Sequence, residues 1–191
     1  MTLLLNPTKK SAQFFRYIEL AEKDEAPKVN KFFSWTANNL AVAGKKCLFL
    51  VNDLTYASVF IANVTAEDRK NLAEIVHYGI DMTFDLCGIK RSEIDEYFAT
   101  AGETKVYKAH DNAAISVNNR LNWLGSWVSD KYPIDLSDYY QPMYIKQLLD
   151  YPVGTLKYRN PAEATRLVFD EWLAGRIDDI ESLLKSKKKK Q

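Results

Sequence analysis

The sequence predicts an α+β fold, in which an antiparallel strand meander is packed by helices and the C-terminal part is mostly helical. Three features of the chain support this prediction. Strand-like apolar runs separated by short turns fill residues 33–64. After Thr65, apolar residues recur at three- and four-residue steps, as on one face of an amphipathic helix. From residue 112 onward the pattern is again helical.

The meander consists of three predicted strands, at residues 40–42, 47–51 and 56–61. Turns at residues 43–45 and 52–53 join them, and the first turn contains a glycine that can adopt a positive φ. Strands joined by such short turns pair antiparallel, because a parallel pair needs a crossover of about a dozen residues or more. The central run is apolar almost throughout, so we expect both of its faces to be covered.

Apolar patterns and helix-capping residues predict the positions of the other strands and helices. Residues 3–5 and 104–109 are expected as strands, and residues 8–20 as a helix. Thr65 provides an N-cap hydroxyl in front of an acidic first turn. The segment Asn160-Pro161-Ala162-Glu163 predicts a further helix, because it combines a capping Asn, a proline at the first position and a glutamate at the third.

The chain divides into three predicted parts. Residues 1–128 are expected to form the α+β domain, and residues 129–184 a helical extension packed on it. Residues 185–191 form a basic tail, which we expect to be solvated and disordered. With 191 residues, the chain is long enough to bury a core without disulfides or a structural metal.

Composition bounds the compartment and the cofactors. The formal net charge is +1, which gives no bulk electrostatic reason to expect a nucleic-acid or membrane partner. Cys47 and Cys87 lie in apolar runs and are expected to be buried free thiols. Without a C-x-x-C motif, and with two histidines, we expect no metal and no cofactor. The apolar run at residues 3–5 is too short for a signal peptide, so we expect a cytoplasmic protein without a membrane span.

A family resemblance begins in the segment Ser34-Trp35-Thr36-Ala37-Asn38. The chain resembles an uncharacterised family of bacterial domains of unknown function, whose members carry a Trp-His-Ala-Asn-Leu-type segment, a basic turn and a strand ending near Val-Asn-Asp. The resemblance continues more weakly to residues 111–119 and covers about the first two-thirds of the chain. It implies no activity, and Thr36 and Asn112 replace a histidine and an arginine of the family. The matching residues are Trp35, Ala37, Asn38, Leu40, Val42, Lys45, Lys46, Leu50, Val51, Asn52 and Asp53.

Five residues make up a candidate pocket: Trp35, Asn38, Asp53, Asp111 and Asn119. The amides of Asn38 and Asn119 are the first choice, since an amide offers a ligand both donors and an acceptor. The competing interpretation, which we favour, is that each amide satisfies backbone groups at the end of a strand or helix. Asp53 is similarly expected to be a turn residue that bonds its own backbone.

Aromatic residues crowd one region of the C-terminal part. They suggest either a stacking platform for a partner or the core of the helical extension, and the accompanying leucines favour the core. The residues are Trp123, Trp127, Tyr132, Tyr139, Tyr140, Tyr144 and Tyr151.

Lysines supply the candidate basic contacts, namely Lys45 and Lys46 in the predicted turn and Lys187 and Lys188 in the tail. A charged terminus is more often a solvated end than a nucleic-acid-binding arm.

Three functional hypotheses remain from the sequence. The preferred one is a non-catalytic binding module for a protein partner or a second copy of the chain, acting through the aromatic region or an open sheet edge. The second is an enzyme of unrecognised type with a polar pocket near Asn38 and Asn119. The third is a nucleic-acid-associated protein that uses the lysine-rich tail.

Overall fold

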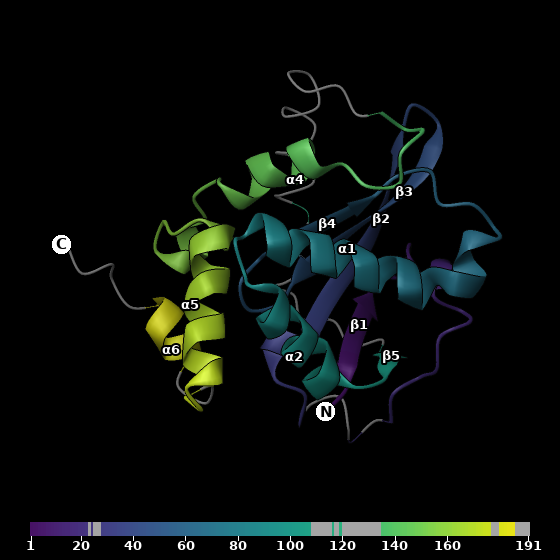
Figure 1. Cartoon of the computed structure of the whole chain (residues 1–191). Helices are drawn as coiled ribbons and strands as arrows, with labels where there is room; N and C mark the ends of the chain where they lie inside the picture. Colours follow the sequence, from purple (N-terminus) through teal and green to yellow (C-terminus); the bar gives the residue numbers. More distant parts are fainter. Residues whose placement is uncertain are drawn as a thin grey trace.

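The computed structural model describes residues 1–22, 24, 28–107, 116, 119, 135–176 and 180–185 (Figure 1). Within these residues the chain forms a mixed five-stranded sheet with the order β4-β3-β2-β1-β5, together with packed helices. The predicted α+β class is confirmed, and the C-terminal part is helical as expected. The strands are β1 (Leu3–Pro7), β2 (Ser34–Val42), β3 (Lys45–Asn52), β4 (Ser58–Ile61) and β5 (Thr104–Val106).

The antiparallel meander is confirmed as β2-β3-β4. The hairpin between β2 and β3 runs from the pair Trp35↔Asn52 to the pair Val42↔Lys45, and β4 continues it antiparallel to β3. Ala43 and Gly44 both have positive φ, at 45° and 76°, as a two-residue turn between twisted strands requires. The first strand starts at Ser34 rather than near residue 40, because its polar first half is paired on both sides.

Strand β1 joins the meander to β5. It pairs parallel with β2 through Leu4↔Ser34 and parallel with β5 through Leu3↔Thr104. These pairs connect segments far apart in the sequence, which local patterns cannot align. The outer strands have further backbone partners, because Ile61 of β4 bridges Tyr140 and Val106 of β5 bridges Leu20.

Two expected helix positions are corrected. Residues 8–20 contain only the short 3₁₀ helix η1 (Ala12–Phe14), because the Ser11 hydroxyl bonds the Ala37 carbonyl oxygen at 2.7 Å and ties the segment to β2 instead. Thr65 caps a turn through the Asp68 amide, and the 3₁₀ helix η4 (Asp68–Asn71) precedes helix α1 (Leu72–Leu86). The long helix therefore starts at Leu72, six residues later than the first helical position that a Thr65 cap predicts.

The C-terminal helices follow as α4 (Pro142–Leu149), the 3₁₀ helix η5 (Gly154–Leu156), α5 (Pro161–Leu173) and α6 (Ile180–Lys185). The predicted cap of α5 is confirmed, since the Glu163 amide donates to Asn160 Oδ1 at 2.7 Å. The predicted domain boundary near residue 128 lies outside the described residues. The tail from residue 186 onward does too.

An aromatic cluster fills the core between the sheet and the helices. Its rings come from the 3₁₀ helix η3 (Lys31–Phe33), strand β2, helix α1, helix α2 (Arg91–Ala101) and helix α5. Tyr97 stands at its centre, fully buried, and burial raises the pKa of its hydroxyl. Cys47 and Cys87 are buried free thiols, as expected. The cluster comprises Phe32, Phe33, Trp35, Phe84, Tyr97, Phe169 and Trp172.

Candidate functional site

Trp35 lies in the aromatic core, where its ring packs 5.9 Å from that of Phe84. Since successive side chains of a strand point to opposite faces, Asn38 lies on the other face of β2, together with Ser34 and Thr36. Trp35 is thus separated from the polar residues with which the sequence grouped it. The structure assigns it to the packing of α1 and α2 against the sheet.

Asp53 is held by a network of donors at the start of β2. Its Oδ1 accepts from the Thr36 amide at 3.1 Å and the Thr36 hydroxyl at 2.6 Å. Its Oδ2 accepts from the Ser34 hydroxyl at 2.5 Å and from Asn6 Nδ2 at 3.1 Å. Both carboxylate oxygens are therefore occupied by protein donors. This arrangement is suited to tying β1, β2 and the end of β3 together, and it leaves little acceptor capacity for a substrate.

Asn38 and Asn119 do meet in space, as the sequence-based grouping anticipated. Asn38 Nδ2 donates to Asn119 Oδ1 at 3.3 Å, and the Thr8 hydroxyl donates to Asn38 Oδ1 at 3.0 Å. Asn38 Oδ1 also accepts from the Asn39 amide at 2.9 Å. Asn119 is exposed. The pair forms a small polar patch just beyond the carboxyl end of β1, where the parallel pairing with β2 stops at Pro7↔Ala37.

The candidate basic residues divide into two groups. Lys45 and Lys46 are exposed at the start of β3, next to the hairpin turn. Lys187 and Lys188 lie outside the described residues, and so does Asp111 of the candidate pocket.

A pocket that the sequence did not predict lies in front of α4, between the segment that leads into this helix and its first turn. Its volume is about 330 Å³, and apolar and acidic side chains share its wall. Gln141 braces it, because its Nε2 donates to the carbonyl oxygens of Asp135 and Asp138 at 2.5 and 3.0 Å, while its Oε1 accepts from the Asp135 amide at 3.2 Å. The lining residues are Asp135, Asp138, Tyr140, Gln141, Pro142, Met143 and Tyr144.

Aromatic and apolar side chains surround this pocket. Met143 is 68% exposed and Tyr78, on α1, is 61% exposed. The Tyr78 and Tyr140 rings lie 4.8 Å apart, and the Tyr140 hydroxyl donates to the Ile75 carbonyl oxygen at 2.9 Å. Burial raises the pKa of Tyr140 to about 12, so its hydroxyl remains a neutral donor.

The predicted aromatic region therefore has two parts. Tyr144 is buried against Phe60, with ring centres 5.1 Å apart, and belongs to the core. Tyr139 and Tyr151 are exposed. Trp123, Trp127 and Tyr132 lie outside the described residues. The pocket acids Asp135 and Asp138 were missed, although their position just before the aromatic segment Tyr139-Tyr140 was a usable signal.

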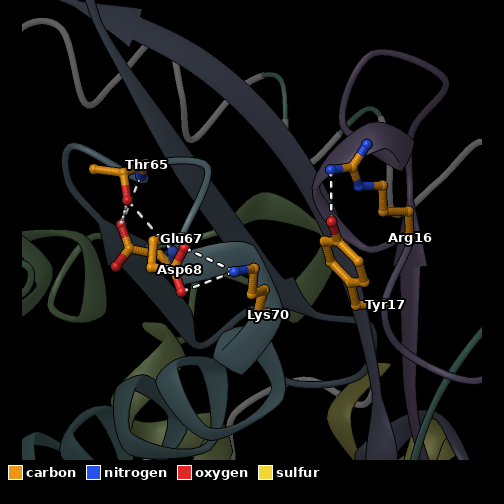
Figure 2. Close-up of polar contacts among 6 residues, drawn as sticks. All are labelled: Arg16, Tyr17, Thr65, Glu67, Asp68 and Lys70. Carbon is orange, nitrogen blue, oxygen red and sulfur yellow. Dashed lines mark hydrogen bonds and ion pairs between the residues drawn. The ribbon is translucent and has the colours of Figure 1, made fainter.

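The segment that forms the pocket is anchored to η4 by a hydrogen bond between Tyr139 and Asp68. Figure 2 shows Asp68 with its other partner, Thr65. Asp68 Oδ2 accepts from the Thr65 amide and hydroxyl at 2.6 and 2.5 Å, and Oδ1 accepts from the Tyr139 hydroxyl. Burial opposes the charge of Asp68, but the hydrogen bonds from Thr65 and Tyr139 outweigh it and lower the pKa of this carboxyl. The same carboxylate raises the pKa of Tyr139. The anchor fixes the exposed Tyr139 ring at the border of the pocket region.

The sequence of the chain matches one known protein family. A family model described as a domain of unknown function, DUF6933, matches residues 4–164 of the chain. The chain belongs to this family. The DUF6933 match confirms the resemblance inferred from residues 34–53 and extends beyond the first two-thirds of the chain. It includes the sheet except for Leu3, together with α1, α2, the pocket and the first residues of α5.

Searches of curated proteins and of solved structures gave no significant match. Within the part of the chain that the structure describes, no helix is long and apolar enough to cross a membrane.

Proposed function

We propose that this DUF6933 protein is a non-catalytic binding module that receives a side chain of a partner protein in the pocket in front of α4. The observation that carries the proposal is the composition of the pocket, in which tyrosine, methionine and proline side chains are combined with two carboxylates. Binding pockets are typically apolar, with a few polar groups that fix orientation.

The chemistry of the pocket favours a long cationic side chain. Asp135 and Asp138 are exposed, and hydrogen bonds from Ser137 lower the pKa of Asp135, so this carboxyl is charged at neutral pH. The half-buried Tyr140 ring offers a π face, and the exposed Met143 side chain offers apolar surface. A lysine or arginine would place its aliphatic stem against these two side chains and its charge near the carboxylates.

The two edge strands of the sheet favour binding of a partner in the pocket over pairing of a partner strand with the sheet. Ile61 of β4 bridges Tyr140, and the Ala62 amide donates to the Tyr139 carbonyl oxygen at 2.8 Å. At the other edge the Val106 amide donates to the Glu19 carbonyl oxygen at 2.8 Å. Since both outer strands already have backbone partners, a peptide strand has less edge to pair with.

A polar-ligand site, and hence an enzyme of unrecognised type, is the second candidate. It is favoured by the contact between Asn38 and Asn119 at 3.3 Å, which places two amides together just beyond the carboxyl end of β1. The full occupation of Asp53 by protein donors supports the binding module instead.

The bacterial origin and cytoplasmic location expected from the sequence belong to this proposal as well. Two buried free thiols, Cys47 and Cys87, support the cytoplasmic location, because cytosolic proteins keep their cysteines reduced.

The test is a set of short peptides that differ only in a central lysine, arginine, norleucine or glutamate, titrated into the full chain. We expect lysine and arginine peptides to bind more tightly than norleucine, and glutamate to bind weakest. The double variant Asp135→Asn with Asp138→Asn is expected to weaken lysine binding by about tenfold, the effect of two rim charges together.

Glu96→Gln is the matched control, because it removes an exposed acid on α2, away from the pocket. Equal binding of all four peptides, or equal losses in the double variant and the control, would contradict the proposal.

A further inference from the structure

Arg69, at the start of the 3₁₀ helix before α1, has an unusual environment for an arginine. Its guanidinium carbon lies 4.6 Å from the ring centre of Phe14, which is fully buried. Its Nε is buried and lacks a hydrogen-bond partner. Among the described residues no carboxylate forms an ion pair with it. The Phe14 ring therefore packs against the face of the guanidinium, and no carboxylate of the described residues neutralises its charge.

Two further cations lie in the same region. Arg16 Nη2 donates to the Tyr17 hydroxyl at 2.7 Å. Glu67 raises the pKa of Lys70, and the nearby Tyr17 acts in the same direction. Figure 2 shows Lys70 with Glu67 on one side and the Arg16–Tyr17 pair on the other.

The carboxylates of this region do not balance the three cations. Glu67 contacts Lys70, with N–O distances of 3.0 and 2.9 Å. Asp68 is turned toward Thr65 and Tyr139, which occupy its oxygens. Arg16 and Arg69 thus carry an excess positive charge, next to aromatic rings.

We propose that Arg16, Arg69 and Lys70 form a binding site for a phosphate group. A guanidinium whose face is stacked on an aromatic ring presents its N–H edge in a fixed plane, which suits two parallel bonds to phosphate oxygens. Lys70 supplies a mobile point charge, and the Tyr17 ring offers a surface for a group attached to the phosphate. The site is separate from the pocket in front of α4 and independent of the proposed function.

The phosphate has two sources, a small phosphorylated ligand or a single-stranded nucleic acid. Titration of inorganic pyrophosphate, followed by NMR shifts of the Arg69 and Lys70 amides, tests the first source. Fluorescence anisotropy of a labelled twelve-nucleotide poly-dT tests the second. Saturable binding of pyrophosphate alone assigns a small ligand, and tighter binding of the oligonucleotide assigns a nucleic acid. The absence of binding to both probes overturns the proposal.

Variants locate the site. Arg69→Gln is expected to weaken binding by at least tenfold, and Arg16→Gln by several-fold while leaving the contact between Arg69 and Phe14 in place. Arg91→Gln is the control, because Arg91 is exposed and paired with Asp81 and Asp95. For the oligonucleotide, each lost phosphate contact should reduce the slope of log K against log salt by about 0.7. Unchanged affinity in a folded Arg69→Gln protein also overturns the proposal.

Discussion

The indole Nε1 of Trp35 donates to the Tyr97 hydroxyl at 3.1 Å, so that strand β2 and helix α2 share a polar bond inside an aromatic core. The same hydroxyl donates to the Phe32 carbonyl oxygen at 3.0 Å. Two segments far apart in the sequence, residues 32–35 and helix α2, are thus joined through one buried oxygen.

The first prediction concerns that oxygen. Tyr97→Phe keeps the ring but leaves the buried Trp35 N–H without its acceptor. It also removes one of two donors to the Phe32 carbonyl oxygen, which keeps its bond from Asn52 Nδ2 at 2.8 Å. We expect the free energy of unfolding to fall by about 1–3 kcal/mol, as measured by urea denaturation. Tyr158→Phe is the control and should change stability by less than about 0.5 kcal/mol, since Tyr158 is 78% exposed. Equal effects of the two changes would mean that the buried bond contributes little.

The second prediction concerns Asp53. In Asp53→Asn an amide nitrogen replaces one carboxylate oxygen and faces donors from either Thr36 or Ser34. We expect a loss of about 3 kcal/mol in the free energy of unfolding, because hydrogen bonds to a charged group are lost and donors are left unpaired. Asp85→Asn on the exposed side of α1 is the comparison. If both variants unfold at the same urea concentration, the network does not stabilise the sheet.

The third prediction concerns pH and His77. Burial lowers the pKa of His77, with Glu74 acting weakly in the opposite direction. Its Nε2 lies 2.6 Å from the Thr104 hydroxyl and its ring stacks 4.9 Å from that of Phe98. The unfolded chain binds this proton more readily, so stability is complete above the unfolded value near 6.5 and is lost as pH falls through the lower folded pKa.

Thermal unfolding between pH 5 and 7.5 measures this dependence. We expect His77→Gln to flatten it, at some cost in stability at neutral pH from lost packing. His110→Gln is the control for the other histidine of the chain. If the slope between pH 5 and 7 persists in the His77 variant, another group titrates there.

The fourth prediction concerns the approach of α1 to β4. A Cβ at Gly79 would lie 2.5 Å from Val59 Cγ1, well inside contact distance. Gly79→Ala should therefore destabilise the protein by about 1–3 kcal/mol through overpacking, outweighing the roughly 1 kcal/mol gained in helix propensity. Gly154→Ala is a matched control, because no atom lies within 4 Å of its added Cβ. A stabilised Gly79→Ala protein would show that α1 shifts freely on the sheet.

The local part of the fold was predictable from the sequence. Short turns identified the meander β2-β3-β4, and the cap Asn160 identified α5, because both signals act within a few residues. The parallel pairing of β1 with β2 and β5 was not predictable. It depends on which distant strands share a core, and this core is completed by helices α1, α2 and α5, which lie far along the chain.

The candidate site was predictable only in part. The grouping of Asn38 with Asn119 is matched by a contact, whereas strand alternation sends Trp35 to the opposite face. The pocket before α4 was missed because its shape depends on the backbone of residues 135–141, which Gln141 braces through three hydrogen bonds. A glutamine with this role has no distinctive sequence pattern.

The match to DUF6933 ends at residue 164, inside α5, yet Phe169 and Trp172 lie further along the same helix. Both rings contact Phe32, at 5.1 and 5.6 Å between centres. A chain trimmed to the family limits would open one side of the aromatic core to water and remove most of the helix that closes it. The smallest unit of this protein that folds independently is therefore expected to be longer than the segment by which the family is recognised.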